Sequence, residues 1–500
     1  MVEFDGRKAA LHNLGCKVNA YETDAMKEQL EMAGFTIVPF EERADVYVIN
    51  TCSVTGIADR KSRQMIHRAR KLNPEAVVVA AGCYVQTVPD ESALKDADIL
   101  LGNNRKGMLV GELARLLEER DAEKNAGRAA GAEPKTAAPA EQSAGDLAGC
   151  ETAGLDVGEQ TSRTSAARNT EKKRRDFVQI EDLSRPGAYE EMQLSKIEGH
   201  TRAYIKVQDG CNQFCSYCLI PYARGRVRSR RLADAVEEIR RLAAGGVKEV
   251  VLTGIHLSSY GSDLPEFRDR GGTWHERSAL VDLVEAVGEV PGIERIRLGS
   301  LEPTVVTQER ARRLKNVRQF CPHFHLSLQS GCDATLHRMN RHYSAAEFAA
   351  CCALLRETFE APAITSDVIV GFPGESEAEF EETVKFLEEI ALYETHVFRF
   401  SARQGTRAAV MPGAVSEPVK AERSERLIAL SRENARRFED VRCGMTNEVL
   451  FEEKVELGGT AYYTGLTREY VRVYRRSDED LCGRILQGPI LRLDNRLVLL

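Results

Sequence analysis

The spacing of apolar residues along the chain predicts three regions of regular structure with different periods. Up to about residue 119, short apolar runs alternate with amphipathic stretches of helix length, which is typical of an open, mostly parallel α/β sheet. From Thr201 the alternation resumes with six strand-like runs, which predicts a partial parallel barrel. Beyond an amphipathic helix around residues 423–440 the period changes to two, and five short strands predict a small β-barrel.

The expected strands can be placed in each region. In the first region they are residues 10–15, 46–51 and 77–82, with helices such as 22–33 and 62–72 between them. In the barrel they are residues 204–207, 249–253, 295–298, 325–328, 365–370 and 396–400. In the terminal region they are residues 447–452, 461–465, 470–474, 481–486 and 497–500. The predicted fold class is therefore α/β, with an N-terminal open parallel domain, a partial (β/α)6 barrel and a small C-terminal all-β barrel.

A stretch of low apolar content separates the first two regions. Residues 120–169 are rich in Ala, Gly, Glu, Ser and Thr, so they bury too little apolar surface to offset the entropy of ordering, and we expect a flexible linker. The expected domains span residues 1–119 for the first α/β unit, 120–195 for the linker, 196–440 for the barrel and 441–500 for the terminal β-barrel.

The apolar runs and the cysteine content indicate in which cellular compartment the protein is expected to work. No apolar run reaches 18 residues and the N-terminus carries no hydrophobic segment of signal-peptide kind, so we expect no membrane association and a cytoplasmic location. A reducing compartment keeps thiols free, so the 13 cysteines are expected to serve metals, catalysis or packing rather than disulfides.

Three of these cysteines share one loop directly after an expected barrel strand. Cys211, Cys215 and Cys218 have the spacing C-x-x-x-C-x-x-C. Thiolates are the ligands of iron–sulfur clusters, and a set of three with no fourth nearby leaves one iron open to hold a substrate. A structural zinc knuckle is the alternative, although such sites usually have two spaced cysteine pairs or a nearby histidine, and the next histidine here is His256.

A second set follows the strands of the first region. Cys16, Cys52 and Cys83 each lie one residue past an expected strand. Taken singly, each is more typical of a buried small hydrophobic residue. Because the carboxyl ends of parallel strands share one edge of a sheet, the three thiols should converge, which predicts a second three-thiolate cluster with an open iron. A zinc site with water as the fourth ligand is the alternative.

Two further groups of residues are candidates for binding. The turns at the carboxyl ends of the barrel strands carry glycines and small polar groups that let a nucleoside-like ligand approach the backbone, although each turn alone is ordinary for such loops. The candidate residues in these turns are Thr253, Gly254, Ser300, Gln329 and Gly371. The terminal region offers charge and stacking surface of the kind that RNA binding uses, the alternative being a purely structural cap. Its candidate residues are Tyr463, Arg468, Tyr470, Arg472, Arg475 and Arg476.

The net charge of −7 argues against a wholly basic nucleic-acid binder, but charge is unevenly distributed. Residues 224–231, directly after the cysteine loop, are rich in arginine and contain no acid. Such a run is often a solvated helix face. Beside a candidate active site, we expect it instead to form a phosphate-binding rim.

The cysteine loop, with the aromatic Tyr217 before its last cysteine, resembles the cluster loop of the radical S-adenosylmethionine enzymes. With the second cysteine set, the barrel and the terminal β-barrel in this order, the whole chain resembles a methylthiotransferase of that class, whose terminal barrel is a TRAM domain. Residues 14–23, 206–211 and 323–331 are similar to the branch that acts on threonylcarbamoyladenosine in tRNA. The isopentenyladenosine branch tends to read Tyr-Gly-Cys-Gln-Met-Asn at the first site, and the ribosomal-protein branch differs again.

The resemblance implies two 4Fe-4S clusters and S-adenosylmethionine as cofactors. Cys211, Cys215 and Cys218 would hold the cluster whose open iron binds S-adenosylmethionine, which an electron cleaves to a 5'-deoxyadenosyl radical, with Tyr217 and the strand-end turns contacting the cofactor. The second set, Cys16, Cys52 and Cys83, would hold the cluster that carries the sulfur to be methylated and transferred.

The expected reaction is methylthiolation of carbon 2 of threonylcarbamoyladenosine at tRNA position 37. Its charged substituent would need a basic pocket, which the arginine run 224–231 could provide. Expected partners are tRNA and a reduced flavodoxin- or ferredoxin-type electron donor, and the protein is expected to be a monomer. The alternatives are methylthiolation of isopentenyladenosine or of a ribosomal protein. A non-enzymatic iron–sulfur carrier is a further alternative, but carriers normally complete their ligand sets with a fourth cysteine.

Overall fold

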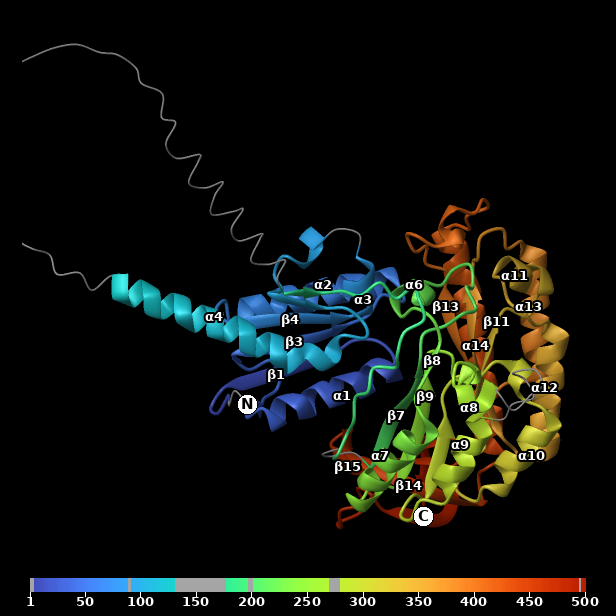
Figure 1. Ribbon diagram of the computed structural model, residues 1–500. Coiled ribbons are helices and arrows are strands. Elements are labelled where there is room, and N and C mark those ends of the chain that lie inside the picture. Colours follow the sequence, from blue (N-terminus) through green and yellow to red (C-terminus); the bar gives the residue numbers. More distant parts are fainter. Residues whose placement is uncertain (1–3, 89–90, 131–176, 197–200, 269–278, 494–495) are drawn as a thin grey trace, which may run out of the picture.

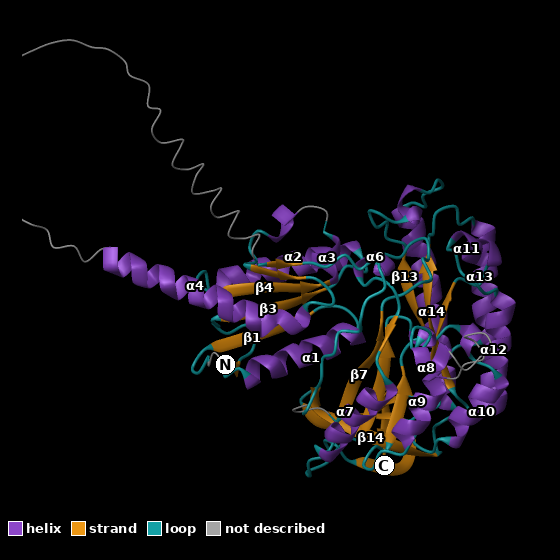
Figure 2. Cartoon of the chain, viewed as in Figure 1, coloured by secondary structure: helices purple, strands orange, loops and turns teal. Residues whose placement is uncertain are grey.

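The computed structural model describes residues 4–88, 91–130, 177–196, 201–268, 279–493 and 496–500, which form three units (Figure 1). An open sheet with helices on both faces comes first, a partial barrel follows it, and a small closed β-barrel ends the chain (Figure 2). In the described part of the chain, no helix has both the length and the apolarity that crossing a bilayer requires.

The N-terminal sheet has six parallel strands in the order β2-β1-β3-β4-β5-β6. The strands are β1 (Lys8–Asn13), β2 (Thr36–Ile37), β3 (Val46–Thr51), β4 (Val77–Gly82), β5 (Ile99–Leu101) and β6 (Val178–Gln179). The helices are α1 (Lys17–Met32), α2 (Gly56–Leu72), α3 (Cys83–Thr87) and α4 (Leu109–Ala130), with short 3-10 turns at Glu91–Leu94 and Lys106–Met108. Every residue of β3 and β4 is buried, as expected for central strands covered on both faces.

The predicted linker, residues 120–195, is too wide at both ends. Helix α4 continues to Ala130, and β6 pairs in parallel with β5 to add a sixth strand to the sheet. The segment from 177 onward is anchored by a few apolar side chains, because Phe177, Met192 and Leu194 are buried in the core that α1 also joins. The low average apolar content of the segment gave no indication of these three buried side chains. Residues 131–176 of the predicted linker lie outside the described residues.

The second unit contains the six predicted parallel strands in two adjoining sheets, β10-β9-β7-β8 and β11-β12-β13, which the parallel bridges Ile296↔Phe320 and Leu301↔Leu326 connect. The strands are β7 (Arg202–Asp209), β8 (Arg228–Ser229), β9 (Glu249–Gly254), β10 (Arg295–Leu298), β11 (His323–Gln329), β12 (Ala363–Val370) and β13 (Glu394–Arg399). The helices are α6 (Ile220–Ala223), α7 (Leu232–Ala244), α8 (Pro265–Arg268), α9 (Ala279–Gly288), α10 (Gln308–Asn316), α11 (Asp333–Arg338), α12 (Ala345–Thr358), α13 (Glu377–Ile390) and α14 (Glu417–Asp440). Short 3-10 turns lie at Leu257–Ser259, Pro303–Val305 and Arg407–Val410. The antiparallel β8 was not foreseen.

The terminal unit is a closed barrel in the order β14-β15-β16-β18-β17. Its strands are β14 (Thr446–Leu457), β15 (Thr460–Thr467), β16 (Arg472–Arg475), β17 (Ile485–Leu493) and β18 (Arg496–Leu499). It docks on the amino ends of the central strands, where Arg295 Nη1 donates to Leu466 O (2.7 Å) and Arg297 Nη2 to Thr467 O (2.6 Å). The terminal barrel therefore covers the end of the central barrel opposite to the Cys211 loop.

This docking corrects part of the predicted RNA surface. Arg468 donates to the carbonyls of Arg318 and Phe320, and the Tyr470 ring stacks on His323 at 4.6 Å, so both side chains serve the interface between the two barrels. Tyr463 lies in the terminal barrel's own core. Arg472, Arg475 and Arg476 are not buried.

A buried group of charges joins the N-terminal domain to the barrel. Glu22 of α1 binds Lys106 from its own domain, and it binds Lys206 (2.7 Å) and Arg224 (2.9 Å) from the barrel. Lys206 and Arg224 also bind Asp209, at 2.8 and 3.1 Å. Burial raises the pKa of Glu22, but the three surrounding cations outweigh it and hold the pKa well below its ordinary value. Undocking the two domains would leave Glu22 with Lys106 alone and would leave Lys206 and Arg224 sharing Asp209, so the buried group stabilises the docked arrangement.

Candidate functional site

A constrained turn leads from β7 into the loop of Cys211, Cys215 and Cys218. Gly210 has a φ of +70°, and a Cβ there would lie 1.9 Å from the carbonyl oxygen of Arg226, so no other residue fits. The Cys211 amide donates to Gly225 O (2.9 Å), and Ser216 N donates to Met339 O (3.0 Å). The loop is therefore held at the carboxyl end of the barrel by contacts on both sides.

The three thiols of this loop lie close enough to influence one another's ionisation. Burial raises the pKa of Cys211 and of Cys218 to about 12, and the neighbouring Cys215 adds to both shifts. Backbone amides approach the sulfurs, with Gln213 N at 3.5 Å from Cys211 Sγ and Ile220 N at 3.4 Å from Cys218 Sγ. Without a metal the thiols of Cys211 and Cys218 stay protonated at neutral pH, so metal binding must displace their protons.

The second set converges as the strand order predicted. Register pairs Asn13 with Asn50 and Thr51 with Gly82, so the strands before the three cysteines end at one edge. Cys16 then caps α1, Cys52 follows β3 and Cys83 begins α3. At Gly15, whose φ is +111°, a Cβ would lie 3.0 Å from the Cys52 sulfur, so the first turn passes very close to the second cysteine.

Charge and hydrogen bonding at this set come from both domains. Burial raises the pKa of the Cys52 thiol to about 11, and the nearby Arg224 guanidinium of the barrel opposes this shift and also favours the thiolate form of Cys16. Asn103 Nδ2 donates to Cys83 Sγ (3.5 Å) and to Ala223 O (2.8 Å) in helix α6, which follows the Cys211 loop. Asn103 thus connects a thiol of one set to the polypeptide that carries the other.

The distances between the sulfurs of each cysteine set distinguish a single zinc site from an iron–sulfur cluster site. A tetrahedral Zn²⁺ with bonds of about 2.3 Å needs sulfurs roughly 3.8 Å apart. Among the described residues, neither cysteine set has all three sulfurs within 4.8 Å of one another. A multi-iron cluster takes each thiolate on a different iron and so requires the wider spacing. Both sets fit a cluster with one open iron better than a single zinc ion.

The predicted cofactor-contacting residues lie at the same end of the barrel but differ in surroundings. The Tyr217 ring meets Phe372 edge-on at 6.3 Å. Thr253 is buried, and Gly254 lies against Gln208, where a Cβ would be 2.8 Å from the amide oxygen. Ser300 is exposed beyond β10, and Gln329 ends β11 with a φ of +72°.

Gly371 has a packing explanation of its own. Its φ is +72°, and a Cβ there would lie 2.3 Å from Cγ of Lys420 on α14. Its amide donates to Glu375 Oε2 at 2.6 Å. Packing against α14 therefore accounts for this glycine without any ligand.

Residues that the sequence did not single out surround Cys215. Arg341 Nη1 donates to Cys215 Sγ (3.0 Å), and its Nη2 binds Glu302 Oε1 (2.8 Å). Glu302 also binds His256 Nε2 (3.1 Å) and accepts from Gln213 Nε2 (3.3 Å). Although burial raises the pKa of Glu302, the His256 hydrogen bond and the Arg341 charge hold it below its ordinary value. His256, Glu302 and Arg341 lie far apart in the sequence, so no local motif groups them.

The predicted phosphate rim at residues 224–231 is wrong for its central arginines. Arg224, Arg228 and Arg230 are fully buried. Acids from distant elements pair with them: Glu22 and Asp209 bind Arg224, and Glu238 of α7 binds Arg230. Arginines without an acid in their own segment can thus be neutralised in the fold. They serve as buried ion-pair partners and do not offer a free basic surface.

Comparison with known proteins covers all three units. The radical SAM superfamily matches residues 205–387, and the uncharacterized protein family UPF0004 matches residues 8–102. The threonylcarbamoyladenosine tRNA methylthiotransferase MtaB of Bacillus subtilis is 35% identical over 97% of this chain and 93% of its own. Its namesake in Aquifex aeolicus is 34% identical over 96% and 99%. The tRNA-2-methylthio-N(6)-dimethylallyladenosine synthase of Caldicellulosiruptor saccharolyticus is 30% identical over 90% and 83%.

The two family matches divide between the two cysteine sets. Cys16, Cys52 and Cys83 fall within residues 8–102, and the Cys211 loop falls within residues 205–387. The relatives extend the match through the terminal barrel to nearly the whole chain. The chain belongs to the radical S-adenosylmethionine methylthiotransferase family.

Proposed function

We propose that this protein attaches a methylthio group to carbon 2 of threonylcarbamoyladenosine at position 37 of tRNA. The observation that carries this choice is the full-length similarity to threonylcarbamoyladenosine methylthiotransferases, at 32–35% identity, compared with 29–30% for the dimethylallyladenosine synthases. The enzyme is a transferase that uses S-adenosylmethionine and two 4Fe-4S clusters. We further propose that it acts in the cytoplasm as a monomer, reduced by a flavodoxin- or ferredoxin-type donor.

The cysteine sets divide the work. Cys211, Cys215 and Cys218 would hold the cluster that binds S-adenosylmethionine, and Cys16, Cys52 and Cys83 would hold the auxiliary cluster. Carbon 2 of adenine carries no acidic proton, and the bound clusters and cofactor supply the one-electron chemistry that this position requires. The chain itself places one guanidinium beside each set, Arg341 at Cys215 and Arg224 near Cys16, which offsets the negative charge of the thiolates.

The two cysteine sets lie close enough together to act on one substrate. Asn103 and the packing of α3 against α6 keep the carboxyl edge of the N-terminal sheet beside the carboxyl end of the barrel. An adenine held between these edges could present one carbon to both sets. We propose the domain roles accordingly: an auxiliary-cluster domain that runs to α4 and also includes β6, the radical barrel through α14, and a terminal TRAM barrel that binds tRNA.

The substrate assignment predicts a specific chemical loss in cells. In tRNA from cells lacking this protein, 2-methylthio-threonylcarbamoyladenosine should disappear and its unthiolated precursor should accumulate. The measurement is nucleoside analysis of digested tRNA by mass spectrometry. A plasmid copy of the wild-type chain should restore the product, and loss of the isopentenyl product instead, or no change in either, would overturn the assignment.

The terminal barrel predicts where tRNA affinity resides. Arg476 Nη2 donates to the Tyr462 hydroxyl (3.0 Å), and Arg496 lies 5.9 Å from the Tyr462 ring centre, so these residues and Arg475 form a basic, aromatic hollow. Replacing Arg475, Arg476 and Arg496 with alanine should weaken tRNA binding. The slope of log affinity against log salt should shrink by about one for each phosphate that the variant no longer binds.

The hollow lies on the terminal barrel, at the end of the molecule opposite to the Cys211 loop. The weaker tRNA binding of the triple variant should therefore raise the KM for tRNA and leave kcat unchanged. The control is Arg240→Ala, which removes an exposed arginine of α7 and should change neither value. Unchanged binding in the triple variant would reduce the terminal barrel to a structural cap.

A further inference from the structure

The strands β11, β12 and β13 leave one face open toward the inside of the barrel. Along β11 the side chains alternate between buried and half-buried, and β12 begins the same alternation at Asp367. The half-buried positions include His325 and Asp367, and His396 of β13 is exposed. Helices α12, α13 and α14 pack on the outer side of these strands (Figure 1). The open face is therefore the lumen face, where the side chains of His325 and Asp367 are still 14% and 34% exposed.

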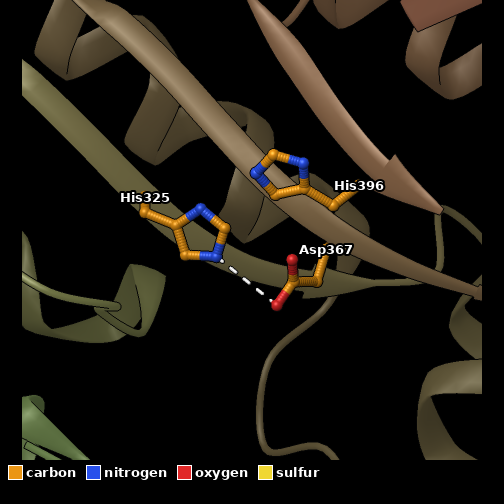
Figure 3. A group of neighbouring side chains, drawn as sticks. All are labelled: His325, Asp367 and His396. Carbon is orange, nitrogen blue, oxygen red and sulfur yellow. Dashed lines mark ion pairs between the residues drawn. The ribbon is translucent and has the colours of Figure 1, made fainter. Parts of the chain in front are cut away.

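Three of these lumen residues form one cluster (Figure 3). His325 Nε2 lies 3.4 Å from Asp367 Oδ2, and the His325 and His396 rings stack with centres 5.7 Å apart. One nitrogen or oxygen from each of the three residues lies within 4.8 Å of the others. The other ring nitrogen of His325, Nδ1, is 2.9 Å from Thr365 Oγ1, which fixes the orientation of the ring.

The cluster lies below the edge where the cysteine loop and the predicted cofactor turns gather. His325 is four residues before Gln329 at the end of β11, and Asp367 is three residues before the end of β12. At about 3.3 Å per residue, the cluster is roughly 10–13 Å below the strand ends. Beneath it, the stacked rings of His323 and Tyr470 close the floor of the lumen. A purine at the strand ends could extend a substituent down to this cluster.

One cation joins the cluster from the N-terminal domain. Lys17 follows Cys16 at the start of α1. Burial and the nearby cations Arg202 and Arg297 lower the pKa of Lys17, and the nearby acids Asp367 and Glu249 oppose this shift. Glu249 is already bound by Arg297 at 2.8 Å and by Arg202 at 3.6 Å. Among the described residues Lys17 forms no ion pair. Lys17 therefore lies near the charged residues of the lumen, close to Asp367 and to His323.

We propose that Lys17, His325, Asp367 and His396 form the subsite that receives the polar N6 substituent of the adenine, and so select threonylcarbamoyladenosine. This inference rests on the proposed function. The substituent carries a carboxylate, a hydroxyl and ureido N–H groups. Lys17 binds the carboxylate, Asp367 accepts from the hydroxyl or an N–H group, and the two imidazoles complete the hydrogen bonding.

This subsite takes the place of the basic pocket that the buried arginine run does not provide. It also predicts discrimination against an isopentenyl group, which would leave the carboxylate, the ammonium and the imidazoles desolvated without partners. A site built to hydrogen-bond a polar group rejects an analogue that lacks it far more strongly than an apolar pocket rejects a small change in size.

A divalent metal ion is the competing occupant, because two histidines and a carboxylate are a common ligand set. The Lys17 ammonium argues against it, since a cation within electrostatic range of Asp367 disfavours a second positive charge at that carboxylate. Metal content is therefore one of the measured outcomes.

The test compares Asp367→Asn and His396→Phe with the wild-type holoenzyme. Affinity is measured for tRNA that carries threonylcarbamoyladenosine at position 37 and for the same tRNA with unmodified adenosine. The wild type should prefer the modified tRNA, and each variant should lose at least tenfold of that preference while binding unmodified tRNA as before. Iron content and 5'-deoxyadenosine formation without tRNA should not change. The control is His337→Phe, which alters an exposed histidine of α11 and should keep the full preference.

The outcomes separate this inference from the proposed function. A wild-type enzyme that modifies isopentenyladenosine and not threonylcarbamoyladenosine would overturn the proposed function itself. A wild-type enzyme that acts on threonylcarbamoyladenosine, with variants that keep the preference or lose affinity equally for both tRNAs, would overturn only the subsite. One equivalent of a metal other than iron, present in the wild type and absent from both variants, would replace the subsite with a metal site.

Discussion

Replacing Cys211, Cys215 and Cys218 together with alanine is expected to abolish formation of 5'-deoxyadenosine from S-adenosylmethionine. The loop keeps its anchoring bonds from Cys211 N and Ser216 N, because these come from the backbone, but it loses every thiolate that could hold the cofactor-binding cluster. The expected fall is to the level of a reaction without enzyme. The measurement is chromatography of the nucleoside products after anaerobic reconstitution and reduction.

The same variant should keep about four of roughly eight irons, because the N-terminal set belongs to a different sheet. The control is Cys443→Ala with Cys482→Ala, which removes two thiols that belong to neither set and should leave iron and cleavage unchanged. Continued 5'-deoxyadenosine formation by the triple variant would show that the radical site is elsewhere.

Replacing Cys16, Cys52 and Cys83 with alanine is expected to abolish the methylthiolated nucleoside while cleavage of S-adenosylmethionine continues. This set is linked to the barrel through Asn103 and the nearby Arg224, which both remain in the variant, so the Cys211 loop should stay in place. Iron should fall by about half. The measurement pairs iron analysis with mass spectrometry of tRNA nucleosides from one reaction.

A full iron content in this second variant would contradict the auxiliary site. Loss of cleavage together with loss of product would show that the two sets depend on each other, and the assignment of separate roles would fail. Circular dichroism of both triple variants should match the wild type, since alanine replaces the thiols without adding volume.

The strands, and the placement of the cysteines near the strand ends, could be predicted because both depend on local sequence patterns. The predicted strands 46–51, 77–82 and 295–298 coincide with β3, β4 and β10. Runs of Val, Ile and Ala that are buried on both faces carry this signal. Cys52 and Cys83 directly follow β3 and β4 as predicted, whereas β1 ends at Asn13 and Cys16 lies three residues beyond it, so the predicted strand 10–15 is placed two residues too late. The parallel order then brings the three N-terminal thiols to one edge without further information.

Features that depend on distant partners could not be predicted in this way. Arg224 and Arg230 appear basic and free in their own segment, and only the fold supplies Glu22 and Glu238. The same holds for Tyr470, an aromatic residue in an arginine-rich stretch that packs on His323. Two-residue strands such as β6 and β8 exist because a neighbouring strand is there to pair with them.

The buried charges around Glu22 have a consequence for how tRNA must approach. Several ion pairs would have to break at once for the N-terminal domain to swing away from the barrel, so the two cysteine sets keep a fixed separation. We therefore expect the enzyme to bind tRNA without opening between these two domains. The nucleotide at position 37 must therefore leave its stack and rotate outward into the space between the sets. That extrusion costs a few kcal/mol of stacking free energy, which binding of the flipped base must recover.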